Sequence, residues 1–159
     1  AKYLPKSNIF CFDINISNFK YKSKKIHVFG IDIKNQKKTI QNIKKIFNRF
    51  EFSKFDIIID DGSHNLSDIL LSLKFFFKFL KKKGLYVIED FKHPNYYPNN
   101  KNINHILIDE LLKNLKIEKI SNSNVLTEVE QKYLMRTIFR IDIFRGNLSD
   151  SDICFLTKV

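Results

Sequence analysis

Apolar residues fall into two patterns that alternate along the chain. Short apolar runs predict strands, and these occupy Asn8–Ile14, Ile26–Asp32, Phe55–Asp60 and Leu85–Phe91. Longer segments with apolar residues at helical spacing predict helices over Lys37–Phe50, Leu66–Leu80 and Ile103–Leu115. The run FDIIID at Phe55–Asp60 lacks polar alternation, which is typical of a strand that is covered on both faces.

The segment Leu66–Leu80 has recognisable helix ends. Asn65 fits an N-cap, and Asp68 stands in the first turn, where the helix dipole favours an anion. Lys81–Lys83 followed by Gly84 predicts a basic last turn and a glycine just after the helix.

The C-terminal part of the chain predicts an antiparallel hairpin. Thr137–Phe144 alternates between apolar and polar residues, and a turn-rich segment leads from it to the last strand, Ile153–Lys158. With the strand–helix order that precedes it, this pattern predicts an α/β fold: a mostly parallel open sheet with helices on both faces and a C-terminal antiparallel hairpin. Nothing marks a linker or a repeat, so we expect one domain over residues 1–159.

The net charge of +11 does not by itself indicate a nucleic-acid partner. Nearly all of the positive charge is lysine, the lysines are scattered, and Lys, Asn, Ile and Phe are overused together, as in an AT-rich genome. We therefore expect a solvated basic surface and no nucleic-acid partner. No apolar run approaches the length of a membrane span and no signal-peptide pattern opens the chain, so we expect a cytoplasmic protein without a membrane partner.

Acidic residues follow the predicted strands. In an open parallel sheet, ligands bind beyond the carboxyl ends of the strands. Four successive strands end in carboxylates here, at Asp13, Asp32, Asp60–Asp61 and Glu89–Asp90. A single acid at such a position is usually a helix cap or a turn residue, but four in succession indicate a site.

The segment Asp60–His64 (DDGSH) and the pair Glu89–Asp90 give the strongest local signal. One helix joins the two strands before them, so we expect the strands to be neighbours about 4.8 Å apart. Their carboxylates would converge and repel one another unless a cation joins them, and hard oxygen ligands select Mg²⁺ or a similar ion. His64 is either a helix-start residue or a base that takes a proton from a hydroxyl held at the metal, and we favour the base.

The stretch FDIIIDDGSH, the helix after it, the Lys-Lys-Gly turn and LYVIEDF together resemble a known family. They look like the metal-dependent sugar O-methyltransferases of the macrocin and mycinamicin type, and are similar to proteins labelled cephalosporin hydroxylase or rhamnosyl O-methyltransferase. The resemblance covers most of the chain and implies a Rossmann-like class I methyltransferase sheet. It also implies S-adenosylmethionine as cofactor, Mg²⁺ or another divalent cation, and a sugar hydroxyl of a glycan or small metabolite as acceptor.

The resemblance implies a role for each acidic residue at the strand ends. Asp13 would accept hydrogen bonds from the ribose hydroxyls of S-adenosylmethionine, Asp32 would lie by the adenine, and Asp60 would sit by the cofactor and the methyl-transfer position. The divalent metal would be held by Asp61, Glu89 and Asp90. His64 would be the general base.

The chain departs from the family at its N-terminal end. The family begins with a strand and a glycine-rich turn of the ExGxxxG type before the position of Asp13, whereas glycine occurs here only at positions 30, 62, 84 and 146. We therefore expect an N-terminally truncated domain that lacks the first strand and its glycine-rich turn. Such a chain alone is expected to bind S-adenosylmethionine weakly.

Two functions of different classes remain open at this point. One is a sugar O-methyltransferase, which the intact DDGSH and ED motifs favour. The other is a catalytically silent Rossmann-like binding module derived from such an enzyme, which the missing glycine turn favours. A hydroxylase has no support, because no triad of two histidines and a carboxylate is apparent. Tyr96 and Tyr97, in the loop predicted at Lys92–Asn102, could stack on a sugar ring.

Overall fold

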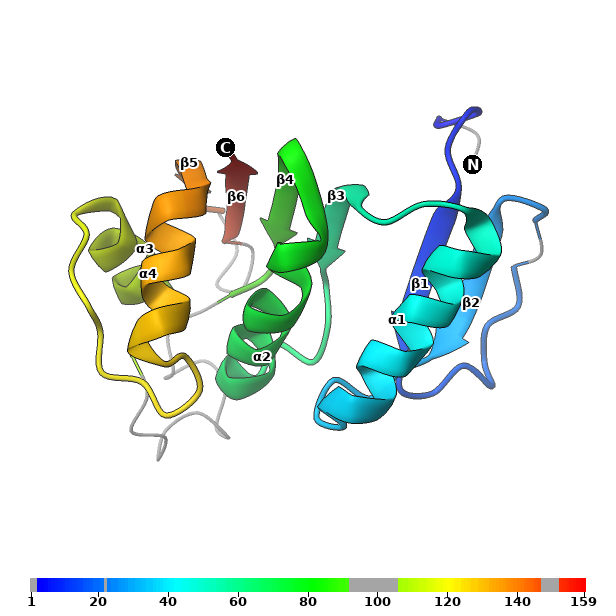
Figure 1. The fold of residues 1–159 in the computed structure, drawn as a ribbon, viewed down its shortest axis with the longest axis horizontal. Helices are drawn as coiled ribbons and strands as arrows, with labels where there is room; N and C mark the ends of the chain where they lie inside the picture. The colour runs from blue at the N-terminus through cyan, green and yellow to red at the C-terminus, as the bar shows by residue number, and fades with distance from the viewer. Residues whose placement is uncertain (1–2, 22, 92–105, 147–151) are drawn as a thin grey trace. The chain divides into compact units, whose positions relative to one another are not determined.

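The structure is a computed structural model that describes residues 3–21, 23–91, 106–146 and 152–159. The chain divides into two compact units, residues 1–51 and 52–159, and each is described by itself (Figure 1). The expectation of one domain over the whole chain stays a prediction. The expected loop at Lys92–Asn102, with Tyr96 and Tyr97, lies outside the described residues.

The first unit consists of two parallel strands and one helix. Strand β1 (Ile9–Asp13) pairs with β2 (Ile26–Gly30), and helix α1 (Gln36–Phe50) follows. The side chain of Asn35 caps α1 by accepting the amide of Lys38. The Phe50 ring stands 5.0 Å from the Phe10 ring, centroid to centroid, so the end of the helix packs on the strand pair. The strands and helix predicted for this part of the chain are confirmed.

The second unit is built on a four-stranded sheet. Strand β3 (Phe55–Asp60) pairs parallel with β4 (Leu80–Ile88), while β5 (Ile138–Phe144) and β6 (Ile153–Lys158) form an antiparallel hairpin. The sheet order is β3-β4-β6-β5, with β4 and β6 antiparallel. This arrangement confirms the predicted α/β class, the parallel pairing before the site and the C-terminal hairpin.

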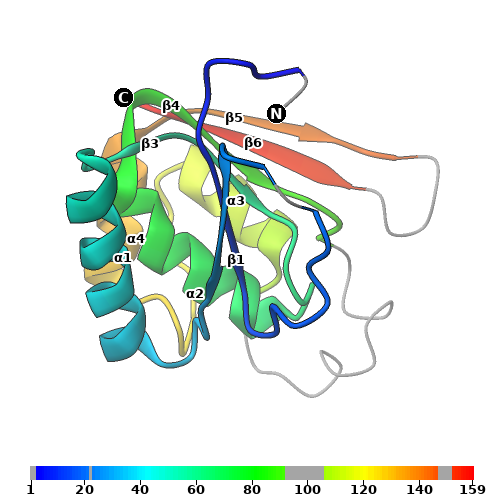
Figure 2. The ribbon, with the colours of Figure 1, turned by 90° about the vertical axis from the view of Figure 1, so that its right-hand side faces the viewer.

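Three helices cover one face of this sheet. They are α2 (Leu66–Phe76), α3 (Ile108–Lys116) and α4 (Glu128–Thr137), and Figure 2 shows all three on the same side. Four side chains on the covered face are fully buried, those of Tyr86, Ile88, Cys154 and Leu156. Among the described residues, no helix is both long and apolar enough to cross a membrane.

The opposite face of β3 is not covered as the sequence predicted. Ile57 and Ile59 are 53% and 59% exposed, whereas Ile58 between them is half-buried. A strand side chain points away from its neighbours, so these isoleucines occupy the face that α2, α3 and α4 leave open. The prediction that Phe55–Asp60 is covered on both faces is therefore wrong for the described part of this unit.

Gly84 has a different role from the predicted one. Helix α2 ends at Phe76, a 3₁₀ turn covers Phe77–Phe79, and β4 has already begun at Leu80. Lys81–Gly84 is a bulge in this strand, because the pairing of β3 and β4 shifts between Phe55↔Leu80 and Ile57↔Leu85. Gly84 is thus not a helix terminator. It lets two backbones approach, since a Cβ there would stand 2.9 Å from the carbonyl oxygen of Asp56.

Helix α4 was missed from the sequence. Its signal is a capping box, in which the Thr127 hydroxyl accepts the amide of Glu130 and the Glu130 carboxylate accepts the amide of Thr127. The residues after this capping box have only a weak amphipathic pattern, because only Gln131 and Leu134 are buried. Apolar spacing alone therefore did not predict the helix.

Replacing Gly84 should be costly. Gly84→Ala places a Cβ 2.8 Å from the Cγ of the buried Leu80 and 2.9 Å from a backbone oxygen, so the sheet must shift. We expect the free energy of unfolding to fall by about 1–3 kcal/mol, the usual cost of overpacking. Denaturant unfolding measures this, with Gly30→Ala as the control, because the nearest atom to a Cβ at Gly30 is 4.0 Å away. Equal losses in the two variants would contradict the role given to Gly84.

Candidate functional site

The parallel pairing of β3 and β4 brings the two acidic motifs to one edge of the sheet. Asp60, the last residue of β3, is opposite Ile88, the last residue of β4. The ladder continues one step further, because the amide of Glu89 donates to the Asp60 carbonyl at 3.0 Å. The residues that follow both strands therefore emerge side by side, as the sequence predicted.

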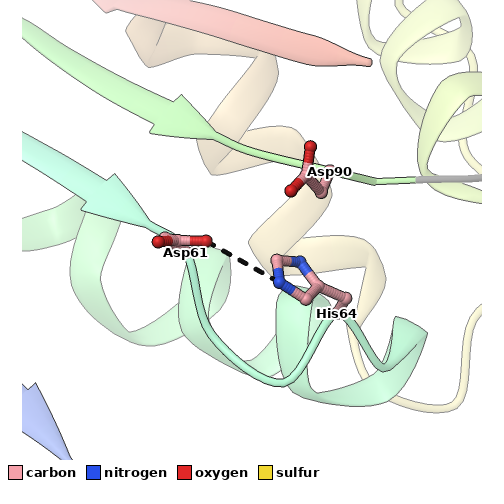
Figure 3. A group of neighbouring side chains, drawn as sticks. All are labelled: Asp61, His64 and Asp90. Atoms are coloured by element: carbon pink, nitrogen blue, oxygen red, sulfur yellow. Dashed lines mark ion pairs between the residues drawn. The ribbon is translucent and has the colours of Figure 1, made fainter. Parts of the chain in front are cut away.

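Asp61, His64 and Asp90 converge at this edge. One carboxylate oxygen of each acid and one ring nitrogen of His64 all lie within 4.8 Å of one another (Figure 3). His64 Nε2 is 3.7 Å from Asp61 Oδ1, too far for a strong hydrogen bond but close enough for both atoms to face one small volume. The Asp61 side chain is 62% exposed and the His64 side chain 27%, so the group opens to solvent.

Two of these three residues have an unusual backbone. His64 has φ 54° and Asp90 has φ 48°, in the left-handed region that non-glycine residues seldom adopt. Such residues gather at functional sites, where the surrounding structure holds them in place. Directly after His64, the Asn65 side chain caps α2 by accepting the amide of Ser67, as predicted.

Glu89 does not belong to the group within 4.8 Å that the described residues form. Glu89 is nevertheless close enough for the charges of Asp61 and Asp90 to shift its pKa. Burial raises the pKa of Glu89 above its ordinary value, and the negative charges of Asp61 and Asp90 raise it further. The predicted set of three carboxylates thus shares one electrostatic environment, and Glu89 as a metal ligand stays a prediction.

Asp60 points in a different direction from Asp61. Its carboxylate is largely buried and accepts hydrogen bonds from the Ser72 and Tyr86 hydroxyls and from the Gly62 amide. Burial raises the pKa of Asp60 to about 6, against the opposing effect of these bonds and of His64. The sequence did not single out Tyr86 or Ser72. The available signal was the hydroxyl of Tyr86 in an otherwise aliphatic run, LYVI.

Asp13 and Asp32 belong to the first unit and keep exposed carboxylates. Asp13, at the end of β1, accepts the amide of Asn15 at 2.8 Å, and Asp32, beyond the end of β2, accepts the amide of Lys34 at 2.9 Å. Their predicted contacts with ribose and adenine stay predictions.

The donor set fits a divalent cation. Asp61 and Asp90 offer the hard oxygen atoms that Mg²⁺ and Mn²⁺ prefer, and Glu89 adds a third carboxylate nearby. A cation would also relieve the repulsion that raises the pKa of Glu89. His64 supplies a nitrogen, which Mg²⁺ accepts less readily than oxygen.

No family model matches the chain, and a search of curated proteins finds no match. Solved structures that resemble it include MycE, a methyltransferase from the mycinamycin biosynthetic pathway, in complex with Mg, SAH and mycinamycin VI. That match has a TM-score of 0.63 and 23% identity, and covers 95% of this chain and 36% of MycE. A crystal form of MycE with Mg and SAH gives a TM-score of 0.62, also at 23% identity with the same coverage. The chain thus has the fold of this methyltransferase and spans about a third of its length.

The raised pKa of Asp60 makes stability depend on pH. Below about pH 3 the carboxyl is neutral in both states, and as the pH rises toward 6 the unfolded chain ionises first, so stability is lost. The change from the ordinary value of 3.8 to about 6 corresponds to about 3 kcal/mol. In metal-free protein, Asp60→Asn should therefore gain about 3 kcal/mol on the parent between pH 3 and 7. Chemical unfolding across this range checks it, and a difference that does not vary with pH would contradict it.

Proposed function

We propose that the full-length protein is an S-adenosylmethionine-dependent O-methyltransferase, assisted by a divalent metal, that acts on a hydroxyl of a sugar or glycosylated metabolite. The observation that carries this proposal is the convergence of Asp61, His64 and Asp90 at the carboxyl ends of two parallel strands. The left-handed backbone of His64 and Asp90 is consistent with it, because strained residues cluster at ligand sites, although Glu51, Lys83 and Glu118 adopt the same conformation elsewhere.

The likeness to MycE supports the cofactor and the acceptor class. MycE is seen with Mg, with SAH, the form of the cofactor that has lost its methyl group, and with mycinamycin VI. The likeness covers 95% of this chain, so the same classes of ligand are the natural ones to test.

Each residue then has a task in the proposed reaction. Asp61 and Asp90, with Glu89, would hold the divalent cation, which would supply a lower pKa to an acceptor hydroxyl. His64 takes the hydroxyl proton as the oxygen bonds to the methyl carbon and the carbon–sulfur bond of S-adenosylmethionine breaks.

The cofactor is assigned to three other acids that follow predicted strands. Asp13 accepts hydrogen bonds from the ribose hydroxyls, and Asp32 lies by the adenine. Asp60 lies by the cofactor at the methyl-transfer position, and its other contacts fix the turn between Asp61 and His64.

His64 has two possible roles, metal ligand and general base, and the His64→Ala variant distinguishes them. Its nitrogen lies within the same 4.8 Å group as the two carboxylates, so it is placed either to bind the cation or to accept a proton beside it. We assign it the proton, because Mg²⁺ prefers oxygen and Glu89 is near enough to complete the set.

A catalytically silent binding module is the alternative function. It predicts that S-adenosylmethionine or the metal binds without methyl transfer to any sugar hydroxyl. Cytoplasmic location and the absence of a nucleic-acid partner stay predictions under both functions.

Loss of a carboxylate should weaken metal binding. We expect Asp61→Asn and Asp90→Asn to lower the Mn²⁺ and Mg²⁺ affinity of the full-length protein by at least about tenfold, since even residues that only orient a ligand cost 10–100-fold. Titration calorimetry measures this. The matched control is Asp56→Asn, at the other end of β3, where an exposed carboxylate pairs with Lys81 at 2.7 Å. Equal affinity in all three variants and the parent would refute the metal site.

Loss of the imidazole should separate catalysis from metal binding. We expect His64→Ala to reduce methyl transfer by about 10²–10⁴-fold, the usual range for a general base, while the affinities for Mg²⁺ and S-adenosylmethionine hardly change. Single-turnover assays and calorimetry on the same preparation test both halves. A loss of metal affinity would make His64 a ligand, and unchanged methyl transfer would remove it from the reaction.

A further inference from the structure

A pair of buried hydroxyl groups lies directly behind the candidate site. Tyr86, on β4, is fully buried, and its hydroxyl oxygen is 2.8 Å from Ser72 Oγ on α2. The same hydroxyl is 3.4 Å from Oδ2 of Asp60, at the end of β3. Three elements of the second unit are thus joined by one polar cluster on an otherwise apolar face.

The bonds of this cluster run toward Asp60. Each hydroxyl has one proton, and the 2.8 Å contact between them can run in either direction, so one of the two hydroxyls always keeps its proton for Asp60. The Tyr86 hydroxyl donates to Asp60 Oδ2 at 3.4 Å, and both hydroxyls favour the ionised form of this carboxyl by lowering its pKa. The two hydroxyls therefore act on the Asp60 carboxylate together, with Tyr86 in direct contact and Ser72 as the partner that orients the Tyr86 hydroxyl.

Asp60 connects these hydroxyls to the turn that carries the site. Its carboxylate accepts the amide of Gly62, and Oδ1 is so close that a Cβ at Gly62 would stand 3.2 Å from it. Asp61 and His64 flank that glycine in the same turn, and His64 is in the left-handed region. A strained turn persists only where other contacts over-determine it, and the Asp60 carboxylate provides such a contact.

We propose that Tyr86, oriented by Ser72, is a positioning residue that acts through Asp60 to fix the turn that holds Asp61 and His64. The ring of Tyr86 fills space between β4 and α2, as a phenylalanine would, so the hydroxyl is the part that serves the site. Burial keeps the pKa of Tyr86 well above its ordinary value, which leaves the hydroxyl a neutral donor. The turn geometry follows from the structure alone, and only its consequence for the metal rests on the proposed function.

Hydrogen exchange at one amide tests the turn directly. In Tyr86→Phe we expect the Gly62 amide to exchange about tenfold faster, the ratio that loss of one hydrogen bond to a charged group corresponds to. The Glu89 amide, which donates to the backbone oxygen of Asp60 rather than to its carboxylate, should keep its rate within about twofold. Ser72→Ala should repeat the effect, so the test does not depend on one variant.

Two controls separate positioning from loss of stability. Tyr133→Phe removes the hydroxyl that lies 3.2 Å from Lys158 Nζ, which is the same chemical change away from the site, and should leave both amides unchanged. In an Asp60→Asn background, Tyr86→Phe should add little, because two residues that act in series are not additive. An unchanged Gly62 rate, a parallel rise at Gly62 and Glu89, or full additivity would each overturn the proposal.

The consequence for the metal is measured separately. Calorimetry with Mn²⁺ should give about tenfold weaker binding for Tyr86→Phe than for Tyr133→Phe in the full-length protein. If the parent protein binds no Mn²⁺, the proposed function fails, while the Gly62 exchange rates still decide the role of Tyr86. If Mn²⁺ binds equally to both variants, the Tyr86 proposal fails and the metal site stands.

Discussion

The register of one parallel ladder determines where every candidate residue of the second unit stands. Ile57–Asp60 pair with Leu85–Ile88, so the acids that follow both strands leave the sheet together. A slip of one residue would turn each side chain of β4 to the other face and separate Asp90 from Asp61. The bulge at Lys81–Gly84 absorbs the residues that would otherwise cause that slip, and Gly84 permits the close approach to Asp56 on which the bulge depends.

Strand alternation gives two adjacent acids opposite properties. Asp60 faces the helices, where burial and three hydrogen bonds act on its carboxyl, whereas Asp61 faces solvent beside His64. Neighbouring carboxyl groups with such different surroundings can take on different tasks. The same motif thus supplies both the candidate site and the anchor behind it.

Much of this arrangement could be predicted from the sequence, because it depends on local patterns. The unbroken aliphatic run FDIIID and the alternating last strands mark their elements, and the rule for strand ends in parallel sheets placed Asp61 beside Asp90. The bulge before Gly84 and the partners of Tyr86 could not be predicted in this way. Both depend on contacts between segments distant in the sequence, such as Asp56 with Gly84 or Ser72 with Tyr86. Helix α4 had a local signal in the capping box of Thr127 and Glu130, but its buried face is too small to give apolar residues at helical spacing.

The left-handed backbone at His64 and Asp90 lowers the stability of the fold at two residues whose side chains are needed to bind a ligand. Glycine adopts this conformation without steric cost, and asparagine does so more easily than most residues. Either substitution at these positions would ease the backbone, and each would also remove an imidazole or a carboxylate from the group. Selection of this chain for thermal stability alone would therefore favour glycine or asparagine at positions 64 and 90. The two residues whose backbone conformation costs folding free energy are the ones that supply the imidazole and a carboxylate of the candidate site.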